Sequence, residues 1–223
     1  WSITKNNMAN KKILLGLTTI TEGEWKNKVK EIDELGLKEV ALFPTCLNVG
    51  ERQELYKLLE KTGLARIPHV HIREEDFSFE EIEYFMAKYQ TEVFNLHASK
   101  SSLEMIERLS PDLRKKIFVE NTNAIPDIFE EIAKRAGGIC LDLSHWEDYG
   151  LLQKIKNYKR FSRLVNKYKI GLNHISAIKK KIEIFHDRLM DADYYNFNSH
   201  DLLDLSEMDY VKKYKNYLAD IIS

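Results

Sequence analysis

The stretch GICLDLSHWED, residues 138–148, joins a short apolar run to a group of polar side chains. The run predicts a buried β-strand, and Asp142 and His145 lie where that strand should stop. Similar apolar, β-rich runs recur along the chain. They are KILLGL from Lys12, EVALF from Glu39, IPHVHI from Ile67, EVFNL from Glu92, KIFVE from Lys116, GICLDL from Gly138 and IGLNHI from Ile170.

The spacing of these runs predicts the fold class. They begin roughly 20 to 30 residues apart, as βα units do. Helix-like segments with start signals lie between them, for example Asn48 with Glu51 and Ser78 with Glu81. The strands are nearly continuously apolar, which is typical of a parallel sheet covered by helices. We therefore expect an α/β fold, a single (β/α)8-type TIM barrel. Its eighth strand would be LADIIS (218–223), with no helix after it.

Length and composition agree with one domain. The chain has 223 residues, of which 43% are hydrophobic, enough for one sizeable core. We assign residues 8–223 to the barrel and exclude residues 1–7, WSITKNN, as an N-terminal extension or an artificial remnant before Met8. A less regular excursion from about Ala177 to Asn198 follows the seventh strand and offers loop length for a site.

Charge and cysteine content limit the function classes. The formal net charge is -1, so no global basic field favours nucleic acid or an anionic membrane. No apolar segment approaches the roughly 20 residues that span a bilayer. Cys46 and Cys140 are too few and too far apart for a disulfide framework, which favours a reducing, cytoplasmic compartment. We predict neither membrane association nor a protein partner.

The polar residues at the strand ends are the strongest functional signal. In a barrel of parallel βα units, the carboxyl ends of the strands converge on the face that holds the chemistry. A lone histidine near an apolar strand is more often a satisfied core residue than a ligand. An array of imidazoles and carboxylates is different, because burial without partners would cost several kcal/mol. Divalent metal ions are the simplest partners, and this ligand set suits zinc first, with manganese as the alternative.

Five of these runs resemble, in order, the metal-binding strand ends of the endonuclease IV family (AP endonuclease family 2) in the xylose isomerase-like TIM-barrel superfamily. The runs are PHVHI (68–72), FNLHAS (94–99), VENT (119–122), GICLDLSHW (138–146) and NHIS (173–176). The resemblance implies a metal held by His69, His97 and Glu120. It also implies that Glu120 bridges to a second ion held with Asp142 and His174, the three residues expected to be catalytic. A third position would use His145 and His200.

Two departures from the family pattern concern the third and second ions. Where the family has Asp, one residue, His, this chain reads NSH, which places the neutral Asn198 at the carboxylate position. The family also draws a glutamate from its eighth strand, and the segment LADIIS contains none.

Three further residues have two interpretations each. His71 would share the strand face of His69, as a second-layer or substrate contact or as core packing. Lys100 would meet a substrate phosphate or lie in solvent. Trp146 would form a wall of the pocket or cap the barrel. Asn198 is grouped with them as a candidate substrate contact.

Three function classes follow from these expectations. The first is hydrolysis of a phosphoester, in abasic DNA or a small sugar phosphate, at a multi-metal site. The second is a single-metal sugar or sugar-phosphate isomerase or epimerase using Glu120, Asp142 and His174. The third is a barrel that binds metal or sugar without catalysis. Because a fold does not select a reaction, only the site can separate these classes.

Overall fold

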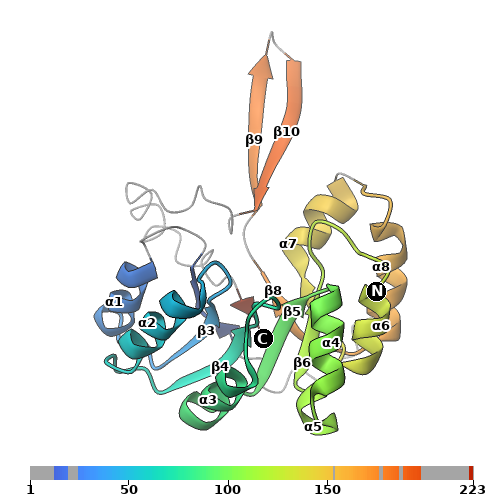
Figure 1. Ribbon diagram of the computed structural model, residues 1–223. Helices are drawn as coiled ribbons and strands as arrows, with labels where there is room; N and C mark the ends of the chain where they lie inside the picture. Colours follow the sequence, from blue (N-terminus) through green and yellow to red (C-terminus); the bar gives the residue numbers. More distant parts are fainter. Residues whose placement is uncertain are drawn as a thin grey trace, which may run out of the picture.

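The computed structural model describes residues 13–19, 25–152, 154–175, 178–185, 188–196 and 221–222. It is an α/β structure in which a curled sheet of parallel strands is flanked by helices (Figure 1). The strands of this part are β1 (Ile13–Leu14), β2 (Gly16–Thr18), β3 (Glu39–Phe43), β4 (Arg66–His71), β5 (Val93–His97), β6 (Ile117–Glu120), β7 (Ile139–Asp142) and β8 (Ile170–His174). All seven runs predicted as strands are confirmed, the first of them as β1 and β2.

Helices follow most of the strands, as βα units require. They are α1 (Trp25–Glu34), α2 (Val49–Leu59), α3 (Phe79–Tyr89), α4 (Lys100–Arg108), α5 (Pro111–Arg114), α6 (Phe129–Arg135), α7 (Leu143–His145), the π-helix η1 (Trp146–Leu152) and α8 (Tyr158–Lys167). The predicted start signals of α2 and α3 are confirmed as capping boxes. In each, the cap side chain accepts a hydrogen bond from the glutamate amide, and the glutamate carboxylate accepts one from the cap amide.

The sheet is continuous, and the two strands at its edges are neighbours in the sequence. Its order is β1-β11-β8-β7-β6-β5-β4-β3-β2, and the pairs from β2 to β8 are all parallel. Leu15 alone separates β1 from β2, the first and last strands of that order. The strand β11 (Ile221–Ile222) lies in the predicted eighth strand but runs antiparallel to both β8 and β1. The expected parallel eighth strand is therefore wrong in direction, because the chain enters β11 from the opposite end of the sheet.

Side chains alternate between the two faces of the sheet. On β6, Ile117 and Val119 pack in the main core with the helices, whereas Phe118 belongs to a second cluster with Cys140 and Leu172. This second cluster lies on the concave face, since its members alternate with helix-facing residues. Because the period is two, the polar strand-end residues fall on the same concave face.

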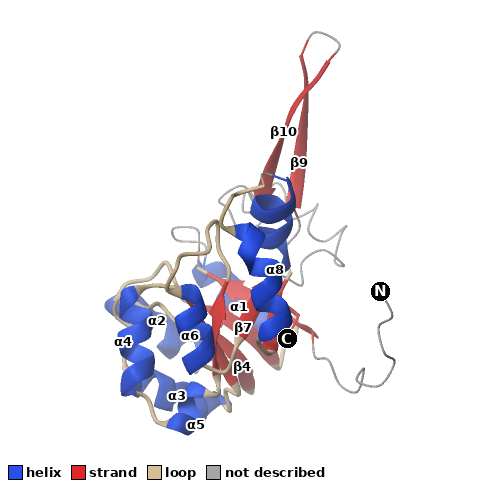
Figure 2. Cartoon of the chain, turned by 90° about the vertical axis from the view of Figure 1, so that its right-hand side faces the viewer, coloured by secondary structure: helices blue, strands red, loops and turns tan. Residues whose placement is uncertain are grey.

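The segment after β8 is more regular than the sequence suggested. Residues predicted as an irregular excursion form an antiparallel ribbon of β9 (Ile178–Phe185) and β10 (Arg188–Asn196). Figures 1 and 2 show this ribbon projecting away from the sheet. Within the described part of the chain, no helix is both long and apolar enough to cross a membrane.

Gly138 should be a sensitive position for stability. Its φ is +129°, and a Cβ there would lie 2.2 Å from the backbone oxygen of Lys169. We expect Gly138→Ala to lower the free energy of unfolding by about 2 to 3 kcal/mol in urea titration. Gly36→Ala is the control, because Gly36 also has a positive φ, +63°, but an added Cβ would meet nothing within 4 Å. Its cost should be nearer 1 kcal/mol. Equal losses in both variants would rule out the steric explanation.

Candidate metal centre

A cluster of imidazoles and carboxylates occupies the carboxyl ends of β4 to β8. Strand register brings its members together: His97 lies opposite Glu120, and Asp142 lies opposite His174. His71, Glu120, Asp142 and His174 are all buried, and His97 is half-buried. The side chains of five consecutive strands therefore share one site, as the sequence predicted for a parallel sheet.

Glu120 is the centre of this cluster. Its Oε2 lies 2.9 Å from Nε2 of His71 and 4.0 Å from Nε2 of His97. Its Oε1 lies 3.0 Å from Nδ1 of His174. The two carboxylate oxygens thus face different sets of histidines, which is the arrangement of a carboxylate that could bridge two cations.

His71, rather than His69, completes the group with His97 and Glu120. The Nε2 atoms of His71 and His97 are 3.1 Å apart. His69 lies one pleat deeper on the same strand, where its Nε2 is 2.5 Å from Oδ1 of Asn95. The structure therefore places His71, and not the expected His69, next to His97 and Glu120. The two histidines share a face of β4 because they are two residues apart, and they differ only in their position along the strand.

One hydrogen bond fixes the tautomer of neutral His71. Nδ1 of His71 lies 3.0 Å from the carbonyl oxygen of Ile72, which can only accept, so Nδ1 carries the hydrogen. In the neutral imidazole, Nε2 is then a lone pair directed at Glu120 and His97. The Nε2 of neutral His71 and the Oε2 of Glu120 are then two acceptors 2.9 Å apart, a contact that a cation or a proton between them would relieve. A divalent ion fits the donor set, and the backbone carbonyl fixes the His71 tautomer as in known metal sites.

The two oxygens of Asp142 have separate environments. Oδ1 accepts a hydrogen bond of 2.8 Å from the amide of His145 and so caps α7. Oδ2 is buried and accepts no hydrogen bond from the described residues, although Nε2 of His145 lies 3.9 Å and Nδ1 of His174 lies 4.0 Å away. Asp142 therefore both starts a helix and directs one oxygen to the cluster, which explains its position at the strand end.

Among the residues that the structure describes, three sets of side chains have ligand atoms within 4.8 Å of one another. They are His71, His97 and Glu120; Glu120, Cys140 and His174; and Glu120, Asp142 and His145. Glu120 belongs to all three sets. Cys140 is new as a candidate ligand, since the sequence analysis considered it only for disulfide formation.

Burial and neighbouring charges determine the protonation of the cluster. Burial favours the neutral acid, but His174 and His71 outweigh it and hold the pKa of Glu120 well below its usual value. Burial and the charge of Glu120 raise the pKa of Asp142, although nearby histidines oppose them. Burial also lowers the pKa of His69 and of His97. Neutral imidazoles are the form that binds metal.

Two asparagines that sequence reasoning missed support the carboxylate of Glu120 and the backbone of Asp142. Asn95 donates from Nδ2 to Oε2 of Glu120, so its Oδ1 is the acceptor for His69. Asn121 donates to the carbonyl of Asp142 at 2.8 Å and accepts from its amide at 2.9 Å, which extends the pairing of β6 and β7 by one side chain. Their signal in the sequence was an asparagine within an apolar run or directly after one.

Of the remaining predicted residues, the structure describes Lys100 and Trp146. Lys100 is the exposed first residue of α4. Trp146 packs edge-on against Phe161 with 5.7 Å between ring centroids. His200 and Asn198, predicted for a third ion, lie outside the described residues.

No protein-family model matches this chain, and no curated protein sequence matches it either. The chemistry of the site therefore has to be argued from its own geometry.

Proposed function

We propose that this chain is a metal-dependent phosphoester hydrolase of the endonuclease IV type, built on a TIM barrel. The bridging position of Glu120 carries the proposal, because its Oε2 faces His71 and His97 while its Oε1 faces His174. The barrel interpretation is supported by the parallel order of β2 to β8 and by Leu15, which joins the two ends of the sheet order.

The cluster would hold two divalent ions. His71, His97 and Glu120 would bind the first, and Glu120, Asp142 and His174 the second, with His145 and Cys140 within reach. Nitrogen, oxygen and thiol donors favour zinc over manganese. Such ions supply Lewis acidity and lower the pKa of a water molecule. The residues of this chain would hold the ions, with Asn95 fixing the carboxylate of Glu120 and Asn121 fixing the backbone of Asp142.

The substrate would be a small sugar phosphate or an abasic site in DNA. The near-neutral net charge of -1 gives no general attraction for duplex DNA, so binding to DNA should be weak and should fall as salt rises.

A single-metal sugar isomerase or epimerase is the second candidate. One observation favours it: Nε2 of His71 and Oε2 of Glu120 are 2.9 Å apart and can form an ion pair without a metal if His71 is protonated. In that case Glu120, Asp142 and His174 would serve one ion, and His71 and His97 would contact the sugar.

Metal content and substrate specificity test the proposal. Protein purified without chelator should contain about two zinc ions per chain and should cleave a sugar phosphate or an abasic oligonucleotide. Chelation should abolish cleavage, and added zinc should restore it. One manganese per chain, with interconversion of a ketose and its epimer and no cleavage of any phosphoester, would replace this proposal with the isomerase.

A further inference from the structure

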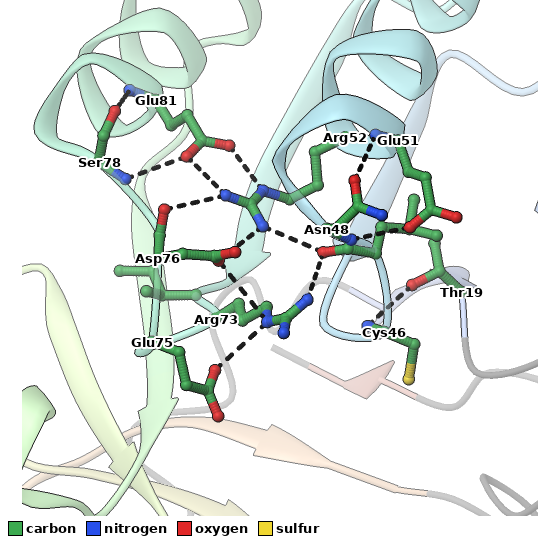
Figure 3. A network of polar contacts seen from close by, with 12 residues as sticks. Thr19, Cys46, Asn48, Glu51, Arg52, Arg73, Glu75, Asp76, Ser78 and Glu81 are labelled. Carbon is green, nitrogen blue, oxygen red and sulfur yellow. Dashed lines mark hydrogen bonds and ion pairs between the residues drawn. The ribbon is translucent and has the colours of Figure 1, made fainter.

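A clamp of charged side chains joins two loops beside the cluster (Figure 3). Arg52, on α2, is fully buried and uses all its N–H donors. It donates to the carbonyl of Leu47, to the side chain and carbonyl of Asp76, and to both oxygens of Glu81. Because Leu47 follows β3 and Asp76 follows β4, Arg52 ties together two loops at the carboxyl ends of neighbouring strands.

Arg73 provides the other anchor of the loop after β4. Its Nη1 donates to the same Leu47 carbonyl at 2.7 Å, and its Nε lies 3.3 Å from Glu75 and 3.6 Å from Asp76. Glu74 therefore lies in the chain between Arg73, which donates to the Leu47 carbonyl, and Asp76, which Arg52 binds. Such anchoring limits the positions that the Glu74 carboxylate can take.

The Glu74 carboxylate faces the outer nitrogen of His97. Its Oε1 lies 3.7 Å from Nδ1 of His97, and only 12% of the Glu74 side chain is exposed. On the opposite side of the ring, Nε2 faces His71 and Glu120. Carboxylate, imidazole and ligand cluster thus lie in sequence. The 3.7 Å separation is longer than a hydrogen bond, so the hydrogen bond by which a carboxylate orients a metal-binding histidine is itself part of the proposal.

We propose that Glu74 is a positioning residue: it holds His97 in the Nδ1–H tautomer, so that Nε2 presents its lone pair to His71 and Glu120. The Arg52 and Arg73 clamp holds Glu74 in place. Only the consequence for metal binding rests on the proposed function, since the tautomer exists in the metal-free protein as well.

The test compares Glu74→Ala with Glu75→Ala, a neighbouring carboxylate whose side chain is 65% exposed. Long-range 1H–15N spectra of metal-free protein, assigned with His97→Ala, report the tautomer. Glu74→Ala should lose the Nδ1–H signature of His97 and bind zinc about 10- to 100-fold more weakly. Glu74→Gln, which keeps an acceptor oxygen, should retain the signature. Glu75→Ala should match the wild type in both measurements, and urea unfolding checks that all variants fold.

The outcomes separate this inference from the proposed function. An unchanged His97 tautomer in Glu74→Ala would overturn the inference, even if zinc affinity fell. Failure of the wild-type protein to bind zinc would overturn the proposed function, whereas the tautomer comparison would still decide the role of Glu74.

Discussion

Glu120→Gln is expected to weaken zinc binding by on the order of 100-fold or more and to remove the proposed phosphoesterase activity. The amide lacks the negative charge that faces His71 on one side and His174 on the other. It also places N–H donors where a cation requires acceptors. Isothermal titration with zinc, in competition with a chelator, measures the affinity.

Glu92→Gln is the matched control for this experiment. Glu92 precedes β5, its side chain is 61% exposed and it pairs with Arg66 far from the cluster. Its zinc affinity should equal that of the wild type. Since Glu120→Gln removes a buried charge, urea unfolding should show that the variant still folds. If the two variants bound zinc equally well, the bridging role of Glu120 would be refuted.

Arg52→Met is expected to lower the free energy of unfolding by about 3 to 5 kcal/mol, because it leaves two partly buried carboxylates and two backbone carbonyls without the buried guanidinium that they bind. The Arg52 side chain is 0% exposed, and those of Asp76 and Glu81 are 30% and 16% exposed. Arg66→Met is the control, since Arg66 pairs with Glu39 and Glu92 near the surface and should cost about 1 kcal/mol or less. Urea denaturation at neutral pH measures both. Equal losses would show that the clamp adds no more than a surface ion pair.

The same variant should change the dependence of stability on pH. Burial acts to raise the pKa of Glu81, but hydrogen bonds from Arg52 and Tyr56 outweigh burial and hold the pKa below its usual value. A carboxyl group with a depressed folded-state pKa stabilises the protein above its unfolded pKa, and this stabilisation is lost as pH falls through the folded pKa. The wild-type protein should therefore lose stability below about pH 4.5, and the loss should be smaller in Arg52→Met.

Much of the candidate site could be read from the sequence. Apolar runs at βα spacing located the strands, and Glu120, Asp142 and His174 lie at the carboxyl ends of three of them. In a parallel sheet the carboxyl ends of all strands lie at the same edge. These residues were therefore expected to lie close together. His97 followed from the same argument.

The choice between His69 and His71 could not be made in this way. Two residues apart on one strand, they share a face, and only the stagger between β4 and β5 shows which one reaches Glu120. The supporting residues were equally inaccessible. Asn95 and Glu74 act through partners on other strands and loops, and nothing in their local sequence identifies those partners.

The sequence by itself determined the strands, the helix caps and the face on which the polar strand ends lie, because these features depend on short-range periodicity and local hydrogen bonding. Only the tertiary structure decided which histidine joins Glu120, that β11 runs antiparallel to β8, and that Arg52 is buried between two loops. Those features depend on register, strand direction and contacts between distant segments. They are set by how the whole sheet curls and packs rather than by any single stretch of residues.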